Sequence, residues 1–201
     1  AVNGLGSDIV AAQTAGGKAA QFLSVPLESI GTAMTTYASQ NMGAHDLNRV
    51  NKGVNTALGI GCVYSVASFL ILRVLDKALI GLFLESSQTE IMANAQSFIF
   101  WNSVFYIPLA VLIIYRYTIQ GLGYSGLAMF AGVAEMVART VVAIALVPVL
   151  GYFGAELSNP AAWIAACVFL YPAYIWTCRQ LDNRLLAAKL HIQGDHAEPI
   201  L

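Results

Sequence analysis

Residues 127–150, LAMFAGVAEMVARTVVAIALVPVL, decide the kind of fold that this sequence can adopt. The stretch is almost entirely apolar, and its only charged residues are Glu135 and Arg139. A helix needs about 20 mostly apolar residues to cross the hydrocarbon core of a bilayer. Residues 127–150 therefore predict a transmembrane helix, and the rest of the chain can be interpreted outward from it.

The same criterion predicts further spans on both sides of this helix. The expected spans are residues 11–39, 54–75, 98–115, 127–150 and 161–178. We therefore expect an all-α, polytopic transmembrane bundle of about five spans over residues 1–178. The charged residues 179–201 are expected to form a solvated tail.

The composition agrees with a membrane environment. Hydrophobic residues make up 58% of the 201 residues and charged residues 10%, whereas soluble domains carry about 25% charged residues. So few charges cannot cover a water-facing surface, so membrane lipid is an expected partner. The net charge of −1 provides no basic field for nucleic acid, which we exclude as a partner.

The distribution of lysine and arginine predicts the orientation, because cytoplasmic loops are enriched in these residues. Six fall on one side of the expected spans: Arg49, Lys52, Arg116, Arg179, Arg184 and Lys189. The other side holds Lys18, Arg73 and Lys77. We expect a multi-pass protein of the plasma (inner) membrane with a cytoplasmic C-terminus. An odd number of spans that starts outside with Ala1 indicates a piece of a longer protein.

The first expected span carries a polar stripe. Its members recur at three- and four-residue steps: Gln21, Ser24, Glu28, Thr32, Thr35 and Ser39. That spacing puts them on one helix face, which must meet other helices or a water-filled cavity. Glu28, two residues after Pro26, is the candidate site for proton or sodium coupling, with Thr32 and Thr35 beside it. Alternatively, the hydroxyls serve helix packing and Glu28 has a structural hydrogen bond.

Two other polar pairs lie in predicted spans. Glu135 and Arg139 are four residues apart on one face, as are Asn102 and Tyr106. Each pair could bind a substrate or a coupling ion, and each could equally fix the packing of helices. In the second span, Gly53, Ala57, Gly61 and Ser65 form a small-residue stripe, which is typical of helix–helix contacts.

The chain offers no catalytic constellation, so we do not expect an enzyme. Cys62, Cys167 and Cys178 lie in apolar runs without CxxC spacing, and neither HExxH nor Gly-x-Ser-x-Gly occurs. No metal site or cofactor is expected beyond a coupling ion, H⁺ or Na⁺.

Two stretches carry a family resemblance. Residues 11–53, AAQTAGGKAAQFLSVPLESIGTAMTTYASQNMGAHDLNRVNKG, resemble the segment of the multidrug and toxic compound extrusion (MATE) family that ends in a Q-N-x-G-A turn before a basic loop. Residues 126–155, GLAMFAGVAEMVARTVVAIALVPVLGYFGA, are similar to the eleventh-helix region of that family. Pro160, Ala161 and Trp163 follow it, where the twelfth helix would start.

The resemblance implies half of a two-lobe transporter. Members have twelve helices in two six-helix lobes and export small, often cationic, drug-like compounds in exchange for H⁺ or Na⁺. On that template the five spans match helices eight to twelve, and an N-terminal lobe lies upstream as a partner of this one. In several members the second-lobe acidic site involves helix seven, which these five spans do not include, or helix ten. The span 98–115 has no carboxylate there and offers Asn102 and Tyr106.

Two alternative functions remain. A lipid-linked oligosaccharide flippase of the same superfamily would need several cavity-facing cations for a pyrophosphate, and only Arg139 is predicted at mid-span. A membrane scaffold without transport would be expected to have an apolar first span, and the polar stripe argues against it.

Overall fold

The computed structural model describes residues 7–83 and 89–195, with side chains described for 8–83 and 89–188. Within these ranges the chain is helical and has no strand, which confirms the all-α expectation. The helices in chain order are α1 (Ser7–Gly43), α2 (Leu47–Gly81), α3 (Thr89–Val104), α4 (Tyr106–Gly121), α5 (Ser125–Val141), the π-helix η2 (Val142–Leu146), α6 (Val147–Leu150), α7 (Tyr152–Glu156) and α8 (Ser158–Asp195).

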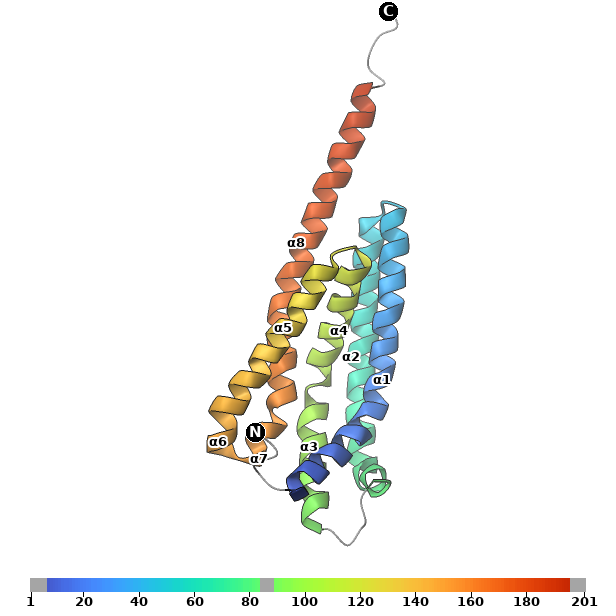
Figure 1. Ribbon diagram of the computed structural model, residues 1–201. Coiled ribbons are helices and arrows are strands. Elements are labelled where there is room, and N and C mark those ends of the chain that lie inside the picture. Colours follow the sequence, from blue (N-terminus) through green and yellow to red (C-terminus); the bar gives the residue numbers. More distant parts are fainter. Residues whose placement is uncertain (1–6, 84–88, 196–201) are drawn as a thin grey trace, which may run out of the picture.

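The helices form one elongated bundle (Figure 1). The connection between α1 and α2, the connection between α4 and α5, and the far part of α8 lie at one end of it. The turn between α6 and α7 lies at the opposite end. The lower part of α1 is tilted against the rest of the helix in Figure 1, and Pro26 lies inside this helix. α8 projects well beyond the other helices.

A tight turn joins α1 to α2. His45 adopts a positive φ of 58°, which reverses the chain between the two helices. Asp46 then caps α2, because its side chain accepts a hydrogen bond from the backbone N–H of Arg49 at 2.9 Å. The turn brings α1 and α2 together as antiparallel neighbours.

The small-residue stripe of α2 is a helix contact, as the sequence predicts. Ala57, Gly61 and Ser65 are buried. A Cβ atom on Gly61 would lie 3.1 Å from the side chain of Ile114 and 3.2 Å from that of Ala110, so α2 and α4 approach closely there. The Ser65 hydroxyl also donates to the backbone oxygen of Tyr106 at 3.0 Å. Small side chains therefore permit the α2–α4 contact.

The expected span 98–115 is broken in the structure. α3 and α4 meet at Phe105 with a bend of 53°. Pro108 explains the position of the break, because it has no N–H to donate to the carbonyl of Val104 and its ring crowds that carbonyl. α4 then continues to Gly121, so Arg116, which we expected in a loop, is a helical residue.

The segment after α5 is irregular. η2 replaces the α-helical pattern immediately before α6, whose second residue is Pro148. A proline inside a helix and a π-bulge are both known causes of local helix distortion. Gly151 follows with φ 58° and ψ −132°, a combination that other residues avoid. It turns the chain into the short helix α7.

Large apolar side chains point outward from the bundle. Val63 and Val74 of α2, Met129 of α5 and Ile144 of η2 are more than 60% exposed, as expected for helices in lipid. Within the described residues, three helical stretches are long and apolar enough to cross a membrane: Leu47–Gly81, Ser125–Leu150 and Tyr152–Ala188. The bent pair α3–α4 gives a fourth if it counts as one span. α1, the most polar expected span, lies outside this set.

Candidate functional site

A polar cavity of about 230 Å³ opens beside α1. It lies between this helix, the broken span α3–α4 and the start of α8. Its lining combines polar and aromatic side chains with a few small or aliphatic ones: Gly17, Ala20, Gln21, Ser24, Glu28, Phe98, Asn102, Tyr106, Leu109, Asn159 and Trp163. The cavity therefore brings together members of two groups that the sequence placed on different helices, the stripe of α1 and the pair Asn102 and Tyr106.

Glu28 is the only carboxylate in the lining of this cavity. Its Oε2 accepts a hydrogen bond from the hydroxyl of Tyr117 on α4 at 2.9 Å. The side chain is exposed, so part of its hydrogen-bonding capacity remains available to a ligand. A carboxylate at the margin of a polar cavity can bind a cation or exchange a proton with water inside the cavity.

Asn102 and Tyr106 flank the break at Phe105 and are both buried. The Asn102 amide donates to the backbone oxygen of Phe98 at 2.8 Å and accepts from Asn159 at 2.9 Å. The Tyr106 hydroxyl donates to the backbone oxygen of Ala20 on α1 at 2.9 Å. Their polar groups are thus largely engaged with the protein, and they shape the cavity wall as well as line it.

The two threonines of the stripe lie outside this lining. The hydroxyl of Thr32 donates to the backbone oxygen of Glu28, one turn back in the same helix, at 3.0 Å. The hydroxyl of Thr35 donates to the backbone oxygen of Tyr117 at 3.1 Å and so ties α1 to α4. A ligand role for either threonine stays a prediction.

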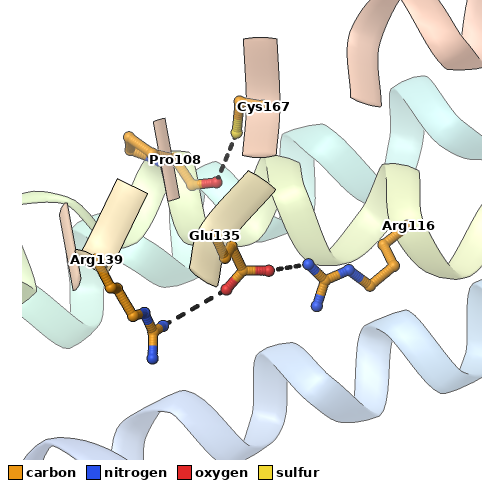
Figure 2. Close-up of polar contacts among 5 residues, drawn as sticks. All are labelled: Pro108, Arg116, Glu135, Arg139 and Cys167. Atoms are coloured by element: carbon orange, nitrogen blue, oxygen red, sulfur yellow. Dashed lines mark hydrogen bonds and ion pairs between the residues drawn. The ribbon is translucent and has the colours of Figure 1, made fainter. Parts of the chain in front are cut away.

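Glu135 and Arg139 form part of a larger ion cluster. Glu135 lies between two arginines, Arg116 of α4 and Arg139 of its own helix (Figure 2). Its Oε1 binds Arg116, and its Oε2 lies 3.5 Å from an Arg139 nitrogen. Arg139 is 47% exposed and makes the weaker contact, whereas Glu135 is 15% exposed. With two guanidinium groups and one carboxylate, the cluster carries a net positive charge.

The cluster faces a groove of about 580 Å³. Its lining comes from α4, α5 and η2: Arg116, Gly132, Glu135, Met136, Arg139, Thr140 and Ala143. Behind the cluster, α4 packs on α8, where Cys167 donates to the backbone oxygen of Pro108 at 3.2 Å (Figure 2). The groove and the cavity at Glu28 are separate, with no lining residue in common.

Sequence reasoning missed several of these residues. Arg116 was expected in a loop, and its pairing with Glu135 depends on a contact between α4 and α5 that spacing cannot show. Tyr117 was likewise outside every expected span. Asn159 and Trp163 belong to the start of α8, where only a helix start was expected. The available signal was a polar residue, Asn159, between two apolar stretches and an aromatic residue, Trp163, at the start of the second.

Within the described residues no group of three or more His, Cys, Asp or Glu side chains could hold a metal ion. The cavity offers the Glu28 carboxylate and several neutral hydrogen-bonding groups, and the groove offers two arginines paired with Glu135. Such groups can bind and release ions and polar molecules.

A helix bundle with apolar side chains on its outside and a polar cavity within it defines a multi-pass membrane protein. Comparison with known proteins then places it more narrowly. The family model described as MatE matches residues 1–145. The chain belongs to the MatE family, as the resemblance of residues 11–53 led us to expect.

One curated relative is the probable multidrug resistance protein YoeA of Bacillus subtilis (strain 168). It is 22% identical over 191 residues, an alignment that covers 90% of this chain and 40% of the relative. The chain thus spans less than half the length of this relative. No solved structure matches the chain at a significant level.

Proposed function

We propose that this chain is part of a MATE-type efflux antiporter that exports small, often cationic, drug-like compounds in exchange for H⁺ or Na⁺. One observation carries the proposal: the polar cavity lies at the break of the α3–α4 span, where Asn102 and Tyr106 line it opposite Glu28. Discontinuous helices at a polar cavity are a general feature of ion and substrate sites in secondary transporters.

The exposed part of the α1 stripe supports a second element of the proposal. Gln21, Glu28, Thr32 and Ser39 are exposed in this chain. A polar helix face is costly against lipid tails, so we propose that it faces a second lobe of the same protein across an aqueous pathway. The name of the curated relative, a probable multidrug resistance protein, agrees with this substrate class.

The orientation proposal follows from the ends of the bundle. The α1–α2 and α4–α5 connections and the far part of α8 share one end (Figure 1). Arg49 and Lys52 follow the first connection at the start of α2, and Arg179, Arg184 and Lys189 lie in the second half of α8. We therefore propose that this end lies in the cytoplasm and that the protein lies in the plasma membrane.

The test is gradient-driven efflux of a cationic dye from cells that express the complete reading frame containing this chain. We expect efflux to require a proton or sodium gradient and to weaken in the Glu28→Gln variant. Collapse of each gradient in turn identifies the coupling ion. Wild-type efflux by Glu28→Gln at equal expression would remove Glu28 from the mechanism, and no gradient-dependent efflux by the unmodified protein would reject the antiporter.

The groove at Glu135 favours one alternative, a flippase for a lipid-linked oligosaccharide. Arg116 joins Arg139 there, which gives two cations where the sequence predicted one at mid-span. Two guanidinium groups can bind a pyrophosphate. The flippase hypothesis predicts that Arg116→Gln and Arg139→Gln abolish translocation of a fluorescent lipid-linked sugar. It also predicts that the unmodified protein shows no dye efflux.

A further inference from the structure

Glu156, the last residue of α7, is a buried carboxylic acid that the proposed pathway does not use. It is 1% exposed, although its place between two expected spans gave no indication of burial. Its Oε2 accepts a hydrogen bond from the hydroxyl of Ser97 on α3 at 3.0 Å. Its Oε1 is buried and has no hydrogen-bond partner.

Among residues 8–83 and 89–188 no positive charge forms an ion pair with this carboxylate. The ion pairs found within residues 8–83 and 89–188 both involve Glu135, and none reaches Glu156. An ionised carboxylate that is buried with one hydrogen bond and no counter-ion is strongly disfavoured, and the usual outcome is that the group takes up a proton. When Glu156 is protonated, the buried group is uncharged and lacks only a second hydrogen-bond partner.

The elements packed against α7 bring few other titratable groups to this position. These elements are α3, η2, α6 and α8. Tyr152 of α7 itself interacts with Glu156. Glu90 of α3 is exposed at the start of its helix. η2 and α6 contain no titratable residue, and neither do residues 158–166 of α8.

The burial is built by specific contacts between α3 and α7, which lie together at one end of the bundle (Figure 1). The Tyr152 hydroxyl donates to the backbone oxygen of Asn94 at 3.2 Å, one turn from Ser97. The rings of Trp101 and Phe153 meet edge to face with centroids 5.2 Å apart. Together with the Ser97–Glu156 bond, these contacts join one face of α3 to the whole length of α7.

The backbone around α7 also fixes its position. Gly151 makes the turn into α7 with a positive φ. A Cβ atom on Gly154 would lie 2.8 Å from the backbone oxygen of Leu146, so α7 approaches η2 as closely as a glycine permits. Close packing of α7 on η2 therefore holds Glu156 against α3.

We propose that Glu156 is a proton-binding site, protonated while α7 is closed on α3 and ionised when the two helices separate. On separation the carboxyl group meets water and releases one proton to it. Reclosure requires a proton from water to rebind the carboxylate, so one proton is exchanged per opening. As a coupling step this rests on the proposed transport function, whereas the protonation itself does not.

The test uses dicyclohexylcarbodiimide on the membrane-embedded, full-length protein. The O–H of a protonated carboxyl group adds across a C=N bond of this apolar reagent, and the adduct rearranges to a stable N-acylurea without a leaving group. We expect mass spectrometry to find the adduct on the peptide that contains Glu156 at neutral pH, with labelling that declines as the pH rises.

The variants keep the interpretation clear. Glu156→Gln should lose the adduct, and Ser97→Ala should keep it, because the carboxyl group remains in place. Exposed Glu90 serves as the internal control and should keep no adduct. Labelling of the unmodified protein needs no variant to fold. Absence of the adduct at Glu156 from mildly acidic to neutral pH would show an ionised, hydrated group and overturn the proposal.

Efflux measurements separate this proposal from the proposed function. An adduct at Glu156 in a protein without any gradient-driven efflux would support the proton site and reject the antiporter. Gradient-driven efflux with no adduct at Glu156 would support the antiporter and reject the proton site. Where both are present, the coupling role predicts that Glu156→Gln reduces proton-driven efflux at least fivefold, and undiminished efflux would overturn that role.

Discussion

The hydroxyl of Tyr117 donates to Glu28 Oε2 at 2.9 Å and so joins α4 to the carboxylate of the cavity. Its neighbour in the chain, Arg116, binds Glu135 on α5. Consecutive residues of α4 therefore hold carboxylates on two different helices. A movement of α4 would affect the cavity and the ion cluster together, which makes Tyr117 an informative position.

Replacing Tyr117 with phenylalanine removes the hydrogen bond to Glu28 and keeps the ring. Hydrogen bonds to charged groups contribute about 1.5–3 kcal/mol, so we expect gradient-driven dye efflux to fall about tenfold if Glu28 works in its ionised form. Ser29→Ala, which loses only a bond from the Ser29 hydroxyl to the Val25 backbone oxygen within the same helix, is the matched control and should keep near-normal efflux. Equal efflux by both variants would show that the Tyr117–Glu28 bond has no part in transport.

Loss of the carboxylate of the ion cluster should cost more stability than loss of its outer arginine. Glu135→Gln removes both ion-pair contacts and leaves Arg116, which is 26% exposed, without its close ion-pair partner. Arg139→Gln removes only the longer contact, from a side chain that is 47% exposed. We expect Glu135→Gln to cost about 2 kcal/mol and Arg139→Gln less than about 1 kcal/mol of folding stability. Thermal unfolding of the purified protein in detergent measures both. A larger effect of Arg139→Gln would contradict this ranking.

Gly121 should be intolerant of any side chain. A Cβ atom there would lie 2.4 Å from the backbone oxygen of Thr35, and backbone atoms cannot move aside as a flexible side chain can. We expect Gly121→Ala to lower stability by about 1–3 kcal/mol, as overpacking of a helix contact does. Gly59→Ala is the control, because no atom lies within 4 Å of its Cβ position. Melting temperatures and yields of folded protein compare the two.

A partly buried polar contact joins α2 to α8. The Tyr174 hydroxyl donates to Asn51 Oδ1 at 2.5 Å, and the thiol of Cys178 lies 3.7 Å from the same oxygen. A double-mutant cycle with Asn51→Ala and Tyr174→Phe should give a coupling energy of about 1 kcal/mol, in the range measured for hydrogen bonds between membrane helices. A coupling energy near zero in chemical or thermal unfolding would show that the two residues do not interact in the membrane.

The sequence predicted the fold in outline because helix formation and lipid exposure depend on local apolar runs. The polar stripe that contains Glu28 and the stripe of small residues around Gly61 were likewise predictable from helical periodicity alone. The positions of Arg116 and Glu156 could not be predicted in this way. Charge suggested a loop for each, but tertiary contacts decide otherwise: Arg116 finds Glu135 across a helix interface, and Glu156 is enclosed by α3.

The break at Phe105 was only partly predictable from the sequence. Pro108 was visible in the sequence, and the loss of its N–H predicts strain one turn earlier. Whether a proline bends a span gently or breaks it depends on whether neighbours satisfy the freed groups. The Ser65 hydroxyl of α2 donates to the backbone oxygen of Tyr106, two residues after the Val104 carbonyl that Pro108 frees, and only the folded bundle supplies this contact beside the break. The roles of Asn102 and Tyr106 beside this break stay predictions.

The length of α8 has a mechanical consequence. Its 38 residues correspond to about 57 Å at 1.5 Å per residue, nearly twice the hydrocarbon thickness of about 30 Å. A continuous helix of that length is a lever whose inner half is anchored in the bundle by α4 and α5. If the bundle tilts by about 10°, the tip of a rod of this length sweeps about 10 Å. A fluorophore on the outer half of α8 would therefore amplify a small rotation of the bundle into a readily measured displacement.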